Sequence, residues 1–267
     1  MQGALDISLA VAPRGVTPRA YTTTLDQLTR SLEELDRLAS PNPKERVAWF
    51  VTDTRWDKNG PRIRLRPDLT KKFRTTEELM GPSRALVSGV RQLQGQPEIP
   101  SHFSEKLVDR VRKVSALTMM DASGLRNVDL SIVGESGEGA ALDENVEKNA
   151  ERAVAAKSFA YGSVIGRLDL ISSRGRAPSI GLLPEHGSPI TCVVSALQQD
   201  TYLSAFNQRV LVEGLVRRNG SGQAIRIEAE SLTVLEPIPR TAARDLLGAL
   251  SPTGVSIADF MEEQRGR

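Results

Sequence analysis

Between residues 161 and 236 the sequence is divided into short apolar runs by turns rich in glycine, proline and asparagine. Apolar runs that are bounded by such turn residues are typical of β-strands. A short insert with apolar residues at helical spacing separates the third run from the fourth. The pattern therefore predicts a β domain of five strands and one short helix, with the strands at 163–173, 178–183, 189–195, 209–218 and 223–235.

The first 133 residues alternate between strand and helix periodicity instead. Apolar and polar residues alternate from Leu5 to Val11, which predicts a half-buried strand. Thr24 and Gln27 have the spacing of a capping box, so we expect a helix to begin there and to end before Pro41. The expected order is β-α-β-β-α-α-β, with further strands at 47–54, 61–67 and 128–133 and further helices at 76–93 and after Ser104.

A connector and a tail complete the chain. Residues 134–151 carry six acidic residues against the single Lys148, and they predict an acidic loop that runs into a linking helix. Pro237 and Pro239 end the last strand. The fold class that we expect is α+β, with an α+β domain at 1–133, an acidic linker at 134–160, the β domain at 161–236 and a helical tail at 237–267.

The second half resembles the OB-fold, a five-stranded Greek-key barrel, in the order of its elements. Gly162–Leu168 opens the first strand and Arg209–Arg218 forms the fourth. Gly166 and Gly214 suit sites where the strands of a small barrel coil sharply. The resemblance implies a domain that binds oligonucleotides or proteins, and another small β-barrel or sandwich is the alternative. The whole chain also resembles two-domain bacterial proteins, which implies no activity.

Composition excludes few classes of partner, but it argues against disulfides and membrane-spanning helices. Lys and Arg total 35 against 33 Asp and Glu, so no overall charge demands a nucleic acid or a membrane. One cysteine leaves no internal disulfide to form, and the longest uncharged stretch has 14 residues, too few for a membrane helix. These features favour a cytoplasmic protein with no signal peptide and no membrane partner.

Catalytic and metal-binding patterns are not evident in the sequence. Cys192 lies in an apolar strand, where a buried and inert thiol is expected. One cysteine and two histidines, His102 and His186, do not supply a tetrahedral zinc site, and no lysine has the context of a P-loop. We therefore predict no catalytic residue, no metal and no cofactor.

Basic residues are better organised. Eight of them lie between Arg55 and Arg74 against two acids, and Arg62, Arg64 and Arg66 share one face of a strand. Such a face is either a solvated or edge-protecting surface or a site for phosphates or an acidic partner. Further candidates lie in the two turns that flank the binding face of an OB-fold, namely Arg174, Arg176, Arg217 and Arg218.

Aromatic residues make up 4% of the chain, and none lies within the strands expected in the second half. Since stacking contributes roughly 1–3 kcal/mol per base, this predicts weak nucleic-acid binding or a different ligand. The tail adds apolar side chains that either fold back onto the domains of the chain or dock in a partner. Its two short amphipathic segments resemble the C-terminal arms of bacterial antitoxins. The docking candidates are Leu246, Leu247, Leu250, Ile257 and Phe260.

The sequence thus favours a non-enzymatic binding protein with a protein partner, such as a toxin or a complex subunit, and with nucleic acid as a second ligand class. Two alternatives stay open. One is an accessory or catalytic subunit of a nucleic-acid-processing or defence complex that uses Asp53 and Asp57. The other is a structural assembly subunit.

Overall fold

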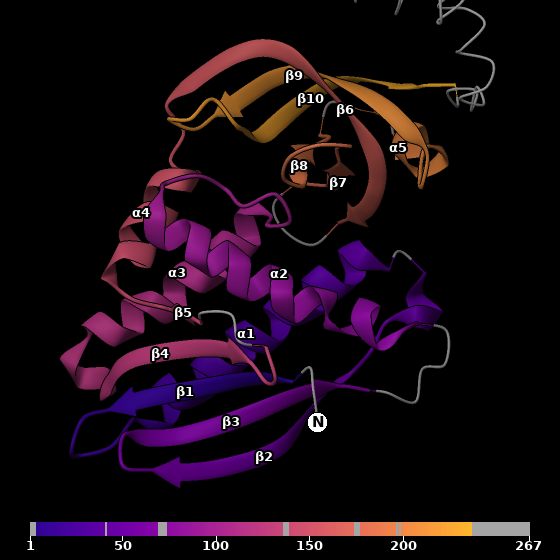
Figure 1. The fold of residues 1–267 in the computed structure, drawn as a ribbon. Helices are drawn as coiled ribbons and strands as arrows, with labels where there is room; N and C mark the ends of the chain where they lie inside the picture. Colours follow the sequence, from indigo (N-terminus) through magenta and orange to yellow (C-terminus); the bar gives the residue numbers. More distant parts are fainter. Residues whose placement is uncertain are drawn as a thin grey trace, which may run out of the picture. The chain divides into compact units, whose positions relative to one another are not determined.

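The computed structural model describes residues 4–40, 42–68, 74–135, 139–173, 177–195, 197 and 199–236. These residues form two sheets of five strands each, with helices packed against the first sheet (Figure 1). The predicted α+β class is confirmed. The sheets and helices belong to one compact unit that ends at Val234.

The first sheet is antiparallel and has the order β2-β3-β1-β4-β5. Leu5, Ile7 and Leu9 of β1 point into the core, while Asp6 and Ser8 point to the other face. The alternation of the sequence therefore decides which face is buried. The strands are β1 (Leu5–Val11), β2 (Trp49–Asp57), β3 (Gly60–Pro67), β4 (Leu125–Ile132) and β5 (Ala140–Ala141).

Four helices cover one face of this sheet (Figure 1). Phe103, in the loop before α3, is completely buried. A Cβ atom at Gly89 of α2 would lie 2.3 Å from the Phe103 ring, so only glycine allows this close approach. The helices are α1 (Pro18–Ala39), α2 (Thr76–Gly95), α3 (Glu105–Met119) and α4 (Glu144–Val154), and two short 3₁₀ turns lie at Pro43–Glu45 and Asp121–Ser123.

The N-cap of helix α1 lies seven residues, about two turns, before the Thr24 that the capping-box pattern predicts. Thr17 is its N-cap and accepts a hydrogen bond from the Ala20 N–H, and Pro18 occupies the first helical position. Thr24 is buried inside the helix, where its hydroxyl donates to the Ala20 carbonyl. The expectation that Thr24 starts the helix was wrong, because Pro18 at N1 is a stronger start signal than threonine spacing.

The segment predicted as an acidic linker contributes to the first core. Val146, Ala150 and Ala153 of α4 are fully buried in that core. Acids of the segment pair with the neighbouring helices, Glu135 with Arg84 and Glu147 with Arg112. Packing against α2 and α3 therefore orders much of this segment.

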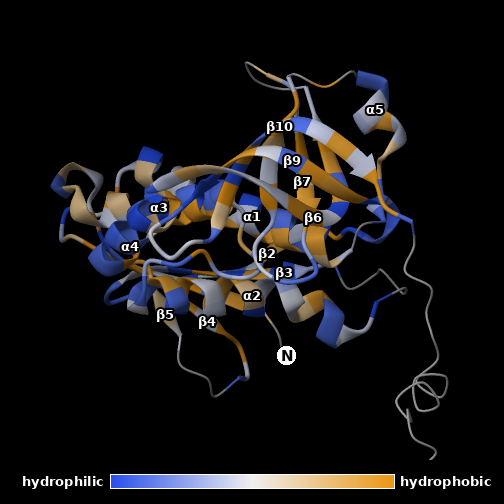
Figure 2. Cartoon of the chain, turned by 90° about the horizontal axis from the view of Figure 1, so that it is seen from above, coloured by the Kyte–Doolittle hydropathy of each residue, from blue (hydrophilic) through white to orange (hydrophobic). Residues whose placement is uncertain are grey.

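The second sheet contains the five strands and the short helix in the predicted order. The ladder runs β8-β7-β6-β9-β10, and β10 also pairs in parallel with β8 through Ile227 and Cys192. Its buried apolar residues form a second hydrophobic core, and its strands carry many residues coloured as hydrophobic in Figure 2. Its elements are β6 (Ser158–Ser172), β7 (Ser179–Leu183), β8 (Ile190–Val193), α5 (Gln199–Ser204), β9 (Arg209–Arg218) and β10 (Ala224–Val234).

Gly214 allows β9 and β10 to approach closely. A Cβ at this position would lie 2.0 Å from the Glu228 carbonyl oxygen, next to a register shift in β10 between Ala229 and Ser231. This agrees with the expectation that a glycine marks a sharply coiled part of the strand. Among the residues described, no helix is long and apolar enough to cross a membrane.

Candidate binding surface on the second sheet

Two of the three arginines of β3, Arg62 and Arg64, hold a buried carboxylate. Asp6 on β1 is 1% exposed, and Arg64 donates to both of its oxygens, from Nε at 2.7 Å and from Nη2 at 3.0 Å. Arg62 also donates to Asp6, from Nε at 3.1 Å. Two guanidiniums on one carboxylate favour its burial, and each of them directs its Nε and Nη2 atoms at Asp6. The hydrogen bond to Asp6 also raises the pKa of Arg64.

Acids from outside the basic stretch balance much of its charge. Arg55 pairs with Asp53 at 2.9 Å, and Arg74 pairs with the buried Asp36 of α1. Arg66 lies opposite Phe50 in the ladder. Strand β3 also lies between β2 and β1, so the idea that its arginines protect a sheet edge was wrong. Within the described part of this stretch, Arg55, Arg62, Arg64 and Arg74 are therefore paired with carboxylates, which reduces the positive charge available for phosphates.

The turn between β9 and β10 contacts the loop before α3 and the end of α4. Gln223 accepts a hydrogen bond from the Ile99 N–H at 2.8 Å and donates to the Ile99 carbonyl at 3.0 Å. Asn219 is 2% exposed and donates to the Ala153 carbonyl at 2.9 Å. Arg218 donates back to Gly222 at 3.0 Å. This turn is therefore engaged in contacts with the first half of the protein.

An aromatic surface lies on β6, where the sequence predicted none. Strand β6 begins at Ser158, so it includes Phe159 and Tyr161, which are 60% and 71% exposed. Phe159 pairs in register with Arg217 and Tyr161 with Leu215. The Arg217 guanidinium lies 5.6 Å from the centre of the Phe159 ring, which is a cation–π contact. The expectation that the strands carry no aromatic residue was wrong.

A shallow hollow of about 570 Å³ lies next to these aromatic side chains. It contains two arginines and two glutamates, and the Tyr161 hydroxyl donates to Glu230. That hydrogen bond raises the pKa of Tyr161. We define the aromatic face as the residues that share this surface: Phe159, Tyr161, Leu215, Arg217, Arg226, Glu228 and Glu230.

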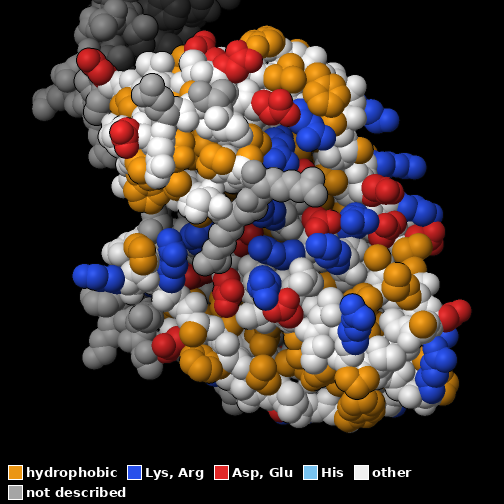
Figure 3. Space-filling model, turned by 180° about the vertical axis from the view of Figure 1, so that it is seen from behind, with side chains coloured by type: hydrophobic (Ala, Val, Ile, Leu, Met, Phe, Trp, Pro, Cys, Tyr) orange, Lys and Arg blue, Asp and Glu red, His pale blue; other side chains and the backbone are white. Residues whose placement is uncertain are grey.

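A second hollow, of about 700 Å³, lies between α1 and strands β7 and β8. Two ion pairs line it, Arg37 with Asp169 at 2.7 Å and Arg110 with Glu34 at 2.6 Å. Burial raises the pKa of Asp169, and the nearby Arg37 offsets only part of this effect. Basic and acidic side chains are interspersed in a band across the middle of the molecule seen from behind (Figure 3). We assign the paired charges that line this hollow a structural role.

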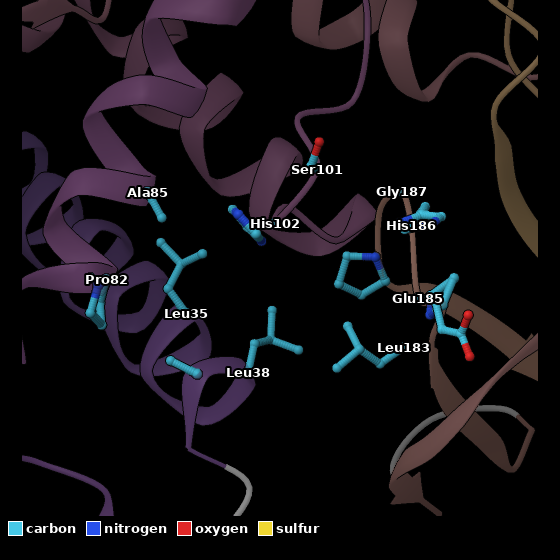
Figure 4. Close-up of a pocket in the computed structure, with 14 residues that line it drawn as sticks. Leu35, Leu38, Pro82, Ala85, Ser101, His102, Leu183, Glu185, His186 and Gly187 are labelled. Carbon is cyan, nitrogen blue, oxygen red and sulfur yellow. The ribbon is translucent and has the colours of Figure 1, made fainter. Parts of the chain in front are cut away.

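Both histidines line a third hollow, of about 640 Å³, whose lining is mostly apolar. His102 precedes α3 and His186 lies in the β7–β8 turn, and both lie on one side of the hollow with Leu38 and Leu183 on the other (Figure 4). The described residues contain no cluster of three or more His, Cys, Asp or Glu that could hold a metal.

The candidate catalytic carboxylates have structural partners. Asp57 accepts from the backbone N–H groups of Asn59 and Gly60 and so stabilises the β2–β3 turn. Asp53 holds the ion pair with Arg55. Cys192 is buried as predicted, and burial raises the pKa of its thiol to about 12. Such a thiol is not a nucleophile near neutral pH.

The remaining sequence candidates lie outside the described residues. These are Arg174 and Arg176 of the β6–β7 turn and the tail residues Leu246, Leu247, Leu250, Ile257 and Phe260. A scan against protein-family models and a search of curated proteins both find no match to this chain.

Proposed function

We propose that this protein is a non-enzymatic binding protein whose OB-like second sheet holds a protein partner on the aromatic face. The observation that carries the proposal is the pair of exposed aromatic side chains, Phe159 and Tyr161, beside Arg217. Aromatic residues and arginine are enriched at protein interfaces, where a few such side chains supply most of the binding free energy.

The charge of the aromatic face favours a protein over a nucleic acid. Arg217 and Arg226 are matched there by Glu228 and Glu230. Nucleic-acid affinity depends mainly on unmatched positive charge near the phosphates, whereas protein interfaces use complementary charges of both signs. In the basic stretch around β3, which was the other candidate for phosphate contacts, Arg64 is engaged with Asp6 and Arg55 with Asp53.

A photocrosslinking experiment tests the proposal in the native cell. A benzophenone amino acid at Tyr161 is expected to capture one discrete protein, whereas the same group at Phe206 is the control. Phe206 is 51% exposed and lies outside the aromatic face, so it reports random collisions. Equal capture at both positions would contradict the proposal.

Affinity measurements on the captured partner give the second test. We expect Phe159→Ala to weaken binding by about 30-fold, as at an interface hot spot. Phe206→Ala is expected to leave the affinity unchanged. Circular dichroism of both variants checks that the fold is retained.

Labelled single-stranded oligonucleotides separate the two ligand classes. Fluorescence anisotropy with mixed-sequence DNA and RNA is expected to show weak binding that Phe159→Ala does not change. Tight binding that falls steeply with added salt and is lost in Phe159→Ala would assign the face to nucleic acid instead.

The antitoxin-like tail remains a separate part of the proposal. The docking residues of the tail lie outside the described residues, so the observations on the aromatic face neither support nor oppose this part of the proposal. Deletion of residues 241–267 is expected to remove a toxin-like partner from the purified complex. If a toxin-like partner still co-purified at the wild-type level, the tail assignment would be discarded.

A further inference from the structure

Strand β2 is an exposed edge that contains both tryptophans of the chain. Among the described residues β2 pairs only with β3 and stands at one end of the sheet order (Figure 1). Phe50 and Val51 are each 55% exposed, and Trp56 is 69% exposed. The nine residues of this edge strand thus contain three of the eleven aromatic residues of the chain, namely Trp49, Phe50 and Trp56.

The core face of the sheet continues onto β2 but is uncovered there. Val51 pairs with Leu65, which is 3% exposed, and Leu65 in turn pairs with the fully buried Leu5. One step outward from β3 to β2, the exposed fraction rises from 3% to 55%. Apolar side chains in line with a buried row, on a strand with free backbone groups, are typical of an edge that receives another strand.

The charges on β2 are arranged to attract a second copy of the same strand. Asp53 and Arg55 are two residues apart and lie on the same face, since they pair with Arg64 and Arg62. In an antiparallel pair centred on Thr54, Asp53 of each copy lies opposite Arg55 of the other. Opposite charges at facing positions stabilise a strand pair, whereas like charges, such as protective lysines, prevent it.

The same register brings the apolar side chains together. Trp56 of one copy then lies across from Thr52 and beside Val51 of the other. Aromatic side chains against β-branched ones are favourable cross-strand pairs. Two such contacts, related by the two-fold axis, would remove both exposed Trp56 side chains from water.

We propose that β2 is a homodimer interface at which two copies of this chain pair antiparallel through Asp53 and Arg55. The interface uses no residue of the aromatic face, so it is independent of the partner proposed above. Because one strand with a few side chains buries less surface than the roughly 1,200 Å² of a standard interface, the dimer dissociates on dilution.

Sedimentation velocity of the full chain over a dilution series is the primary experiment. The wild type is expected to change from dimer to monomer across the series, with a red shift of tryptophan emission as Trp56 becomes exposed. A wild-type protein that stays monomeric at the highest concentration reached would overturn the proposal. The edge of β2 would then be left to a strand from another protein.

A charge-swap experiment tests the register. Asp53→Arg alone places Arg opposite Arg, and Arg55→Asp alone places Asp opposite Asp, so each variant is expected to be monomeric. In an equimolar mixture the two variants face each other with opposite charges at both positions, and we expect the dimer to return. If the mixture stayed monomeric while wild type dimerised, this register would be wrong.

A matched control uses another exposed Asp–Arg pair. Asp26 and Arg30 form an exposed ion pair at 2.8 Å within helix α1, outside the sheet. Asp26→Arg and Arg30→Asp are expected to dimerise like wild type. Loss of dimer in these controls would show that the effect of the β2 variants is one of general charge, and would overturn the assignment to β2.

Discussion

Arg64 and Arg217 lie at interior positions of two antiparallel ladders, yet their neighbours give them different roles. Arg64 faces the buried Asp6 and donates two hydrogen bonds to it. Arg217 faces the exposed Phe159 and lies over its ring. The residue that the adjacent strand places opposite an arginine therefore decides its role. The arginine either neutralises a buried carboxylate or contributes to an exposed surface.

The largest expected effect comes from Arg64→Met. This change leaves the buried Asp6 with Arg62 alone, and breaking a buried charge pair costs about 3 kcal/mol of unfolding free energy. Urea denaturation followed by circular dichroism measures this cost. A loss below about 1 kcal/mol would mean that Arg62 alone neutralises Asp6.

An intermediate effect is expected for Asn219→Ala. Asn219 is 2% exposed, donates to the Ala153 carbonyl and accepts from the N–H groups of Ser221 and Gln223. Removing the amide leaves buried backbone groups without partners, which costs about 2 kcal/mol. The same denaturation series measures it, and Ser221→Ala at the exposed turn is the control.

The smallest effect on stability is expected for Arg217→Met. A cation–π contact at an exposed site contributes less than about 1 kcal/mol, so the unfolding midpoint should barely move. Binding of the protein partner should fall by about tenfold, because Arg217 belongs to the aromatic face. Should Arg217→Met destabilise the fold as much as Arg64→Met, the distinction between the two arginines would fail.

The order of elements follows from the sequence because it depends on local patterns. The bounds predicted for β1 and β9 are confirmed to the residue, and Ser104 caps α3 as expected. The start of β6 does not follow, since Phe159 and Tyr161 alternate with Ala160 and Gly162, whose small side chains carry little apolar signal. Pairing with β9, more than 50 residues later, extends the strand to Ser158.

The candidate site was harder to predict for the same reason. A charge count between Arg55 and Arg74 shows an excess of positive charge, but the acids that balance it, Asp6, Asp36 and Asp53, lie outside that window. The aromatic face combines residues from β6, β9 and β10. Only the strand register brings such distant residues together, and register is a property of the whole sheet.

The Gln223 side chain has a consequence for the order in which this chain becomes structured. Its amide forms both hydrogen bonds with Ile99, a residue 124 positions earlier. During synthesis the ribosome releases the first sheet and its helices well before Gln223 exists. The two hydrogen bonds that the Ile99 backbone forms with this side chain can therefore form only after the second half has been made.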